Sequence, residues 1–369
     1  MTFEVLTAAG GNAERWKSLI EGLAAEHRDI HFLPEYGRIY HDTYGFEPHL
    51  AVYTGADGYV IQSFVRRPLA ALPFLAGAAD AANYYDIANP YGYGGPLCSA
   101  ATPSAAQHLY KSFAGAFASW CDEQNLASEF ASLHPFMASA QLALIGDVFA
   151  PRYEKDVVFI DLTGDEADIL KKLRKGHRSS LTVARRAGVK IDRVEPTSGN
   201  LTVFKEMYDA TMIRRQAAQR WFVPGTYFAD CMRHLGSSRT SLFFATVDGA
   251  IESGCLLMHD FSTAYFHFAA TWAKHLQLGA NNMLVFEAGM WAKKAGYTCL
   301  HLGGGVTSNE DDSLLRFKAG FSDQRAPLYT YFSIRDQVVY DRLCERKRAY
   351  ERAMAGAESA SDFLPLYRR

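Results

Sequence analysis

The sequence predicts a mixed α/β protein, and two observations carry this prediction. Two segments, LAVYTGADGYVIQSF from Leu50 and LFFATVDGAIESGCLLM from Leu242, each contain an apolar run, an Asp-Gly pair and a second apolar run. Because Asp-Gly supplies the positive φ angles that tight turns require, each segment predicts a β-hairpin. After the second hairpin come a strand-like run, a helical pattern and a short buried strand at TCLHLGGG. We therefore expect mixed sheets flanked by helices, while the repeat alone leaves a duplication open.

The helical pattern after the second hairpin lies in ANNMLVFEAGMWAKKAGY. Met283, Phe286 and Met290 recur at helical spacing, and Gly296 suits the C-terminal end of a helix. Between the hairpins, the apolar run from Val157 to Leu162 predicts a strand. The acidic residues after it suit the start of a helix, because they lie at the positive end of the helix dipole. This change of pattern places a domain boundary near Pro151.

Composition and charge exclude several classes of protein. The chain has 369 residues, of which 49% are hydrophobic and 21% charged, and this is typical of a folded protein with room for two domains. The formal net charge of −2 excludes an indiscriminate nucleic-acid binder, so affinity for polyanions has to be local. The N-terminus lacks a signal-peptide pattern, and Pro73 interrupts the longest apolar stretch, so we expect no membrane span.

The cysteines and the known catalytic motifs narrow the chemistry further. The six cysteines are scattered, without a C-x-x-C pair or a histidine at zinc-finger spacing. This usage predicts reduced thiols, a cytoplasmic protein and no metal site. The chain also lacks the G-x-S-x-G, H-E-x-x-H, Walker and G-x-G-x-x-G motifs.

A basic segment follows the predicted strand. Eight basic residues lie between Lys171 and Lys190 with no acid among them. Wound as one helix, four of them form a single stripe, namely Lys171, Lys175, Arg178 and Arg185. Such a stripe can follow the phosphates of RNA or of a ligand. The alternative is a solvated helix face, but acids normally alternate with bases in such faces, and we favour a role facing an anion.

A glycine-rich motif lies near the end of the second half, in LHLGGGVTSNEDDSLLRFKAGFS. Three glycines after a strand let the backbone pass close to another group, and either Ser308 or Asp312 can cap the helix that follows. Lys318 stands between Phe317 and Phe321, and an ammonium held among aromatic rings acts strongly on a nearby oxyanion. The alternative is a surface lysine whose stem covers the rings.

A second glycine-rich loop, NYYDIANPYGYGGPL, carries Tyr91 and Tyr93. Aromatic loops of this kind often line clefts, although they also cross domain surfaces.

The motifs taken together resemble a known family. The order FLPEYGRIY, NPYGYGGPL, SLHPF, LRKGHRSSLTVARRAGVKI, YFHFAAT, WAKKAGYTCLHLGGG and DSLLRFKAGFS resembles the FemABX peptidyltransferases and the related GNAT-like acyltransferases. The resemblance implies tandem GNAT-like domains, the first over 1–150 and completed by 336–369, the second over 151–335. No long heptad insertion is present, so we expect no coiled-coil arm.

The resemblance also implies a function. It predicts transfer of an amino acid from aminoacyl-tRNA to the amine of a peptide or small molecule, in a pathway of peptidoglycan-bridge or antibiotic type. Lys318 with Phe317 matches the family's Phe-Lys pair, which faces the tRNA end and the developing oxyanion. Arg214 or Arg215 lies near the family's arginine for acceptor phosphates, and Arg38 is a candidate for its N-terminal cation. Tyr91 and Tyr93 would also contact the substrate. We expect a monomer with no cofactor.

Aminoacyl transfer needs no protein nucleophile, because the ester of the donor is already activated and positioning and oxyanion stabilisation suffice. The proton of the attacking amine could pass to the substrate, to water, to His267 or to Tyr265.

Two other functions remain open. An acyl-CoA-dependent N-acyltransferase of the GNAT superfamily would hold the CoA pyrophosphate on the loop HLQLGANNM, but Leu276 and Asn281 depart from that motif. A non-catalytic RNA-binding relic of the fold would explain the basic stripe but not the Phe317-Lys318 pair.

Overall fold

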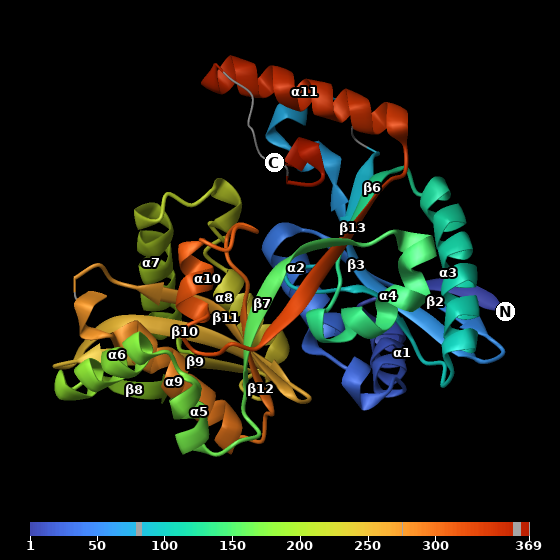
Figure 1. Ribbon diagram of the computed structural model, residues 1–369. Coiled ribbons are helices and arrows are strands. Elements are labelled where there is room, and N and C mark those ends of the chain that lie inside the picture. Colours follow the sequence, from blue (N-terminus) through green and yellow to red (C-terminus); the bar gives the residue numbers. More distant parts are fainter. Residues whose placement is uncertain (79–82, 275, 357–362, 369) are drawn as a thin grey trace. The chain divides into compact units, whose positions relative to one another are not determined.

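The computed structural model describes residues 1–78, 83–274, 276–356 and 363–368 (Figure 1). The chain divides into two compact units. Unit 1 comprises Met1–Glu154 and Leu328–Arg369, and unit 2 comprises Lys155–Pro327. The boundaries predicted at 150/151 and 335/336 fall a few residues away, because two long strands, β7 and β13, carry the chain from one unit into the other.

Unit 1 contains a mixed sheet in the order β1-β2-β3-β4-β6-β13, and β5 pairs separately with β3. The pairing is antiparallel except between β4 and β6, which are parallel. The strands are β1 (Thr2–Thr7), β2 (Glu47–Gly55), β3 (Gly58–Pro68), β4 (Tyr85–Ala88), β5 (Gly95–Cys98), β6 (Leu126–Ser132) and β13 (Arg325–Ile334). The α-helices are α1 (Gly10–Glu21), α2 (Pro34–Tyr44), α3 (Pro103–Glu123), α4 (Pro135–Phe149) and α11 (Gln337–Ala355). Short 3-10 helices are η1 (Ala25–His27), η2 (Ile30–Phe32), η3 (Leu69–Ala71), η4 (Pro73–Leu75) and η8 (Leu366–Arg368).

The core of unit 1 lies between this sheet and α3, the longest described helix with 21 residues. Phe113 and Phe117 of α3 are fully buried against strand residues such as Phe64. The helix can present this continuous apolar face because its large residues recur at helical spacing. A smaller cluster joins α11 to η8 through Tyr340 and Tyr367, which explains why the C-terminal segment belongs to unit 1.

Unit 2 has a mixed sheet in the order β7-β12-β11-β10-β9-β8, in which only the pairing of β12 with β11 is parallel. The strands are β7 (Arg152–Asp161), β8 (Lys190–Val194), β9 (Thr240–Val247), β10 (Ala250–Asp260), β11 (Thr263–Thr271) and β12 (Cys299–Gly303). The helices are α5 (Glu166–Lys172), α6 (Lys175–Arg186), α7 (Ser198–Arg214), η6 (Gln219–Trp221), α8 (Tyr227–Leu235), η7 (Leu276–Leu278), α9 (Ala280–Lys294) and α10 (Ser313–Lys318).

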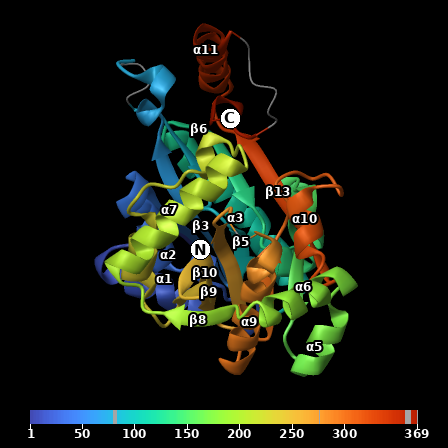
Figure 2. The same ribbon diagram turned by 90° about the vertical axis from the view of Figure 1, so that its left-hand side faces the viewer.

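Helices cover both faces of the unit 2 sheet. On one face, α9 and α6 enclose a core with strand residues such as Phe243 and Leu257. On the other face, Phe204 of α7 packs on Phe244 and Gly254. Figure 1 shows α7 and α8 above this sheet and α6 and α9 below it, and Figure 2 gives the view from the side. Unit 2 is therefore a three-layer arrangement of helices, sheet and helices.

The two predicted hairpins are confirmed, and their turns differ. In the β9–β10 turn, Asp248 and Gly249 both have positive φ, +49° and +80°, as a type I′ turn requires. In the β2–β3 turn, Gly55 pairs with Gly58, so the glycine of the Asp-Gly pair begins the second strand. The predicted strand at 157–162 and the helix after Ala280 are also confirmed.

The single basic helix predicted over 171–190 is wrong. The chain forms two helices, α5 and α6, and they are separated by an extended break at Leu173 and Arg174. The break arises because Leu173, only 1% exposed, enters the core. Lys171 thus lies on a different helix from Lys175, and Lys190 lies on strand β8.

Candidate functional site

β12 ends at Gly303, and Gly303, Gly304 and Gly305 form the glycine turn, in which each residue allows a close approach. Gly303 has a φ of +77°, and a Cβ there would lie 3.2 Å from the Nζ of Lys318. A Cβ on Gly304 would lie 3.0 Å from the carbonyl oxygen of Asp156, and one on Gly305 would lie 2.7 Å from Oδ1 of Asp312. Any side chain in this turn would therefore displace its neighbours. The prediction that the backbone passes close to other groups here is confirmed.

Asp312 connects this glycine turn to helix α10. Its Oδ1 accepts from the backbone N–H groups of Leu314 and Leu315, both at 2.9 Å, and it is the N-cap of the helix. Its Oδ2 accepts from the N–H groups of Val306 and Thr307, both at 3.1 Å. Burial acts to raise the pKa of Asp312, but the hydrogen bonds from the N–H groups of Leu315, Thr307 and Val306 and from the hydroxyl of Thr307 lower it below its ordinary value. Of the two predicted caps, Asp312 is the one that the structure uses.

Lys318 is the last residue of α10, and its ammonium lies against the glycine turn. Its Nζ donates a 2.7 Å hydrogen bond to the carbonyl oxygen of Gly304. Burial, and after it the nearby charge of Lys155, lowers the pKa of Lys318 to about 7, and the charge of Asp312 opposes this shift. A titratable group that is shifted this far into the neutral range marks a candidate functional site.

The expected position of the Lys318 ammonium between two phenylalanines is not observed. The rings of Phe317 and Phe321 pack edge to face with centroids 5.3 Å apart, which leaves no space for an ammonium between them. Both rings instead contact His177 of α6, whose Nε2 donates to the carbonyl oxygen of Phe317 at 2.8 Å. Gly320 provides the space for this imidazole. Phe317 and His177 thus fix α10 against α6, and Lys318 projects to the glycine turn.

A second lysine of this site was missed by sequence reasoning. Lys155 lies on β7, and its Nζ donates a 3.1 Å hydrogen bond to the carbonyl oxygen of Gly305. The ammonium groups of Lys155 and Lys318 therefore bind successive carbonyls of the same turn. No local pattern around Lys155 indicates this, because the partner lies 150 residues away along the chain.

His267 and Tyr265 lie on β11, and the pairing of this strand with β10 skips His267. Tyr265 is buried, and its ring contacts that of His301, its register partner on β12, with centroids 5.1 Å apart. The Nε2 of His267 lies 3.0 Å from the hydroxyl of Tyr227 on α8. The strand that carries both candidates is therefore the neighbour of the strand that leads into the glycine turn.

The predicted arginines and tyrosines for substrate binding have separate surroundings. Arg214 and Arg215 are exposed at the C-terminal end of α7 in unit 2. In unit 1, the Nε of Arg38 donates to the carbonyl oxygen of Ala8 at 2.6 Å. Tyr91 is 47% exposed, whereas the ring of Tyr93 is buried between the rings of His31 and His134.

The four basic residues predicted to bind tRNA phosphates have different partners. Lys171 forms an ion pair with Asp168 at 3.1 Å. The guanidinium of Arg178 donates to the carbonyl oxygens of Lys171 and Leu173, so it caps the end of α5. Lys175 and Arg185 are exposed on α6. The break between α5 and α6 therefore assigns Arg178 a structural contact that the sequence did not indicate.

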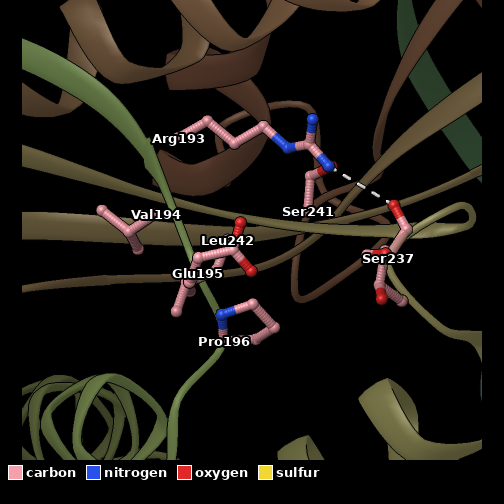
Figure 3. A pocket seen from close by; sticks show the side chains of 8 residues that line it. Arg193, Val194, Glu195, Pro196, Ser237, Ser241 and Leu242 are labelled. Carbon is pink, nitrogen blue, oxygen red and sulfur yellow. Dashed lines mark hydrogen bonds between the residues drawn. The ribbon is translucent and has the colours of Figure 1, made fainter.

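A small cavity of about 120 Å³ lies at the outer strands of unit 2 (Figure 3). Arg193 lies over it and donates to the carbonyl oxygen of Ser237 at 3.4 Å. Ser241 lines the cavity, and its Oγ lies 3.0 Å from Nε2 of His259, whose Nδ1 lies 2.7 Å from the hydroxyl of Tyr297. Burial lowers the pKa of His259 to about 4, so the imidazole is neutral at pH 7. The side chains of Ser241, His259 and Tyr297 thus form a polar chain between separate elements. Because Ser241 is only 2% exposed, its hydroxyl is not presented as a nucleophile.

The described part of the chain shows no metal-binding cluster and no helix that could span a membrane. Within that part, no three side chains of histidine, cysteine, aspartate or glutamate are arranged to hold a metal ion. Across the same residues, no helix has both the length and the apolar composition that a bilayer span requires. All six cysteines are free thiols, and all except Cys299 are buried.

Comparison with known proteins agrees with this architecture. Residues 169–318 match the family model described as an acetyltransferase (GNAT) domain. The crystal structure of FemX superposes with a TM-score of 0.68 at 13% identity, and the match covers 92% of this chain and 99% of that chain. The chain has a GNAT-type acyltransferase fold. This result confirms the predicted fold class and the suspected resemblance to FemABX-like proteins.

Two further solved structures share this fold. L-PGS from Bacillus licheniformis superposes with a TM-score of 0.53 at 15% identity, over 90% of this chain and 94% of that chain. The C-terminal domain of a putative lysylphosphatidylglycerol synthetase from Agrobacterium fabrum gives 0.50 at 13% identity, over 89% and 92%. No curated protein sequence matches the chain.

Proposed function

We propose that this GNAT-fold protein is an aminoacyltransferase that moves an amino acid from aminoacyl-tRNA to the amine of a peptide or small molecule. The observation that carries the proposal is Lys318, a half-buried amine that is fixed on the carbonyl oxygen of Gly304 at the end of a glycine turn. The resemblance of the sequence motifs to FemABX proteins and the similarity of fold to FemX support it.

The chemistry fits such a site. The donor ester is activated, so the enzyme has to position the amine and stabilise the oxyanion that develops on the ester carbonyl. The cationic form of Lys318 supplies a preorganised charge for that oxyanion, because Gly304 and helix α10 fix its position. Ser241, which lies beside His259, is buried in a strand, and the reaction does not require it.

The remaining candidates have roles in binding. Lys175 and Arg185 on α6 would contact tRNA phosphates, and Arg214 or Arg215 would contact an acceptor that bears phosphate. Arg38, Tyr91 and Tyr93 of unit 1 would contact the acceptor. His267 and Tyr265 remain candidates for receiving the proton of the amine. We further propose that the protein is a cytoplasmic monomer without a cofactor, in a pathway of peptidoglycan-bridge or antibiotic type.

The experiment that tests this function compares donors on one panel of amines. Purified protein is incubated with charged tRNA, uncharged tRNA or acyl-CoA, and the products are measured by mass spectrometry. The proposal predicts amide products with charged tRNA only, and it predicts that Lys318→Met abolishes most of the product. Products with acyl-CoA alone would contradict the choice of donor.

An acyl-CoA-dependent N-acyltransferase is the second candidate. The match of residues 169–318 to an acetyltransferase domain favours it, and the N-cap of α9, Gly279, has no side chain to cap the first N–H groups, which is compatible with a pyrophosphate site. However, the space where a Cβ of Gly279 would lie is occupied by the carbonyl oxygen of Ser180 on α6, 2.5 Å away. This helix crowds the start of α9, so we rank CoA second.

Binding of tRNA without product from any donor would instead support the RNA-binding relic.

A further inference from the structure

Two like charges meet at the glycine turn. Lys318, from the end of α10, and Lys155, from β7, donate to the carbonyl oxygens of Gly304 and Gly305, which are consecutive residues. The stem of Lys155 also lies against the turn, because a Cβ on Gly304 would be 3.3 Å from its Cδ and 3.5 Å from its Cε. The two side chains therefore approach the same short stretch of backbone from two different elements.

Charged groups from several elements surround this pair. Asp312 faces Lys318, but its two oxygens already accept four backbone N–H groups. Asp156 follows Lys155 on β7, and Arg325, whose charge interacts with Asp156 and Arg174, lies at the start of β13. His177 contacts the far side of α10 through Phe317. Two neighbouring ammonium groups are unfavourable, and such arrangements persist where they change the protonation of a functional group.

We infer that Lys155 is a positioning residue for the transfer reaction: it fixes the glycine turn, and its positive charge beside the amine of Lys318 favours release of a proton from that amine. The inference rests on the proposed function of Lys318 and extends it, because Lys318 then acts as a proton carrier as well as an oxyanion contact. No role for Lys155 follows from the sequence motifs.

The proton and electron balance of this step is complete. The neutral amine of Lys318 takes one proton from the acceptor ammonium, which becomes a neutral amine. That amine attacks the ester carbonyl carbon, a C–N bond forms, and the electron pair of the carbonyl moves to oxygen beside the now cationic Lys318. When the carbonyl re-forms, the ester C–O bond breaks and Lys318 returns its proton to the leaving ribose oxygen. The second proton of the nitrogen passes to solvent, so the amide, the deacylated tRNA and one proton are the products.

The first arm of the test measures Lys318 directly, without any substrate. The extent of acetylation of Lys318 by acetic anhydride is followed by mass spectrometry as a function of pH. The inference predicts that the midpoint rises by roughly one pH unit in Lys155→Met and Lys155→Gln, because the like charge is removed. Lys155→Arg retains the charge and should keep the wild-type midpoint, and Lys171→Met on α5 is the control for loss of a distant lysine. An unchanged midpoint in both Lys155→Met and Lys155→Gln would overturn the inference.

The second arm measures single-turnover transfer from charged tRNA across the same pH range. The acidic limb of the rate profile should move to higher pH in Lys155→Gln, which keeps a donor for the Gly305 carbonyl, and return in Lys155→Arg. A uniform loss of rate with no displacement would show that Lys155 only supports the turn, and would contradict the inference. If the wild-type protein transfers nothing from charged tRNA, the proposed function fails, and the labelling arm still decides whether Lys155 controls Lys318.

Discussion

The buried carboxylates of unit 1 and the glycine turn of unit 2 differ in how their charges are arranged. In unit 1 the fully buried carboxylate of Asp86 accepts from Arg67 at 2.7 Å, from Arg368 at 2.6 Å and from the hydroxyl of Tyr367 at 2.9 Å. Burial acts to raise the pKa of Asp86, but the two guanidinium groups lower it below its ordinary value. Glu129 is likewise paired with Arg335, and it accepts from Tyr331 at 2.7 Å. Asp86 and Glu129 thus each have opposite charge beside them.

In unit 2, two like charges lie side by side at the glycine turn. Lys155 and Lys318 donate to neighbouring carbonyl oxygens, and Asp312, whose charge acts on Lys318, accepts four backbone N–H groups. The comparison distinguishes charges that stabilise the fold from charges that serve a reaction. A matched buried pair stabilises a fold only as long as both partners remain, whereas a pair of like charges that is retained at a turn points to chemistry.

The largest expected effect concerns the matched cluster of unit 1. Asp86→Ala leaves the guanidinium groups of Arg67 and Arg368 buried without their acid, and it should lower the free energy of unfolding by about 3–5 kcal/mol. Glu47→Ala removes an exposed partner of Arg66 at 3.4 Å and should change stability by less than about 1 kcal/mol. Urea unfolding of both variants measures the difference. Equal free energies of unfolding for the two variants would show that the buried cluster around Asp86 stabilises unit 1 no more than an exposed ion pair does.

The same cluster predicts an acid limb. Because the folded-state pKa of Asp86 lies below that of the unfolded chain, its contribution is present above the unfolded pKa of about 3.9 and is lost as the pH falls through the folded value. Asp86→Asn should therefore lack part of the loss of stability that the wild-type protein shows below about pH 4.

Lys318 predicts a limb on the alkaline side. Its folded-state pKa of about 7 lies below the ordinary value of 10.5, so the unfolded chain binds the proton more tightly between these values. Stability of the wild-type protein should rise with pH from about 7 toward 10, relative to Lys318→Met, because unfolding takes up a proton there. Thermal melts of the two proteins at several pH values check the sign. If the melting temperatures of the two proteins changed with pH in parallel, Lys318 would be an ordinary cation in the folded state.

The exposed cations of α6 sharpen the comparison at the surface. The double variant of Lys175→Gln and Arg185→Gln should weaken tRNA binding and reduce the salt slope by about one to two counterions, because each lost phosphate contact removes roughly 0.7–0.9. Arg178→Gln should instead affect stability, since Arg178 caps α5. Filter-binding titrations over a range of salt measure the slope. An unchanged salt slope in the double variant would show that Lys175 and Arg185 of α6 lie on a solvated face and contact no tRNA phosphate.

The smallest effect concerns the thiols. Cys299 is partly exposed and should react with a thiol reagent in the folded protein, whereas all six thiols should react after denaturation. Burial raises the pKa of the thiols of Cys98, Cys121, Cys231 and Cys255, which slows their reaction further. Counting the titrated thiols before and after denaturation checks this, and more than one fast thiol would contradict the packing of these elements.

Local sequence signals predicted much of this structure and part of the site. The Asp248-Gly249 turn, the helix after Gly279 and the cap at Asp312 could be predicted because each depends on neighbouring residues. The close approach of the backbone at glycines 303–305 could also be predicted from the sequence. The break at Leu173 could not be predicted, because the core that draws this residue in is built from distant segments.

Contacts over long separations explain the rest. Lys155 meets the glycine turn 150 residues later, and the chain of Ser241, His259 and Tyr297 joins residues of separate elements. Neither has a spacing that a sequence motif can encode. The position of Lys318 against Gly304, instead of between two aromatic rings, likewise depends on His177 from a helix 140 residues before Phe317.

The central claim is that the amine of Lys318 acts on the reaction more than on the fold. Single-turnover transfer with saturating charged tRNA, paired with a thermal melt, tests it in Lys318→Met against Arg316→Met, an exposed neighbour on α10 whose guanidinium lies 3.9 Å from Asp311. We expect Lys318→Met to lower the transfer rate by about 10²-fold or more. Its stability should change by no more than about 1 kcal/mol, because the lost hydrogen bond to Gly304 is offset by relief of repulsion from Lys155. Arg316→Met should match the wild type in both. A Lys318→Met protein that melts early and transfers at nearly the wild-type rate would contradict the account.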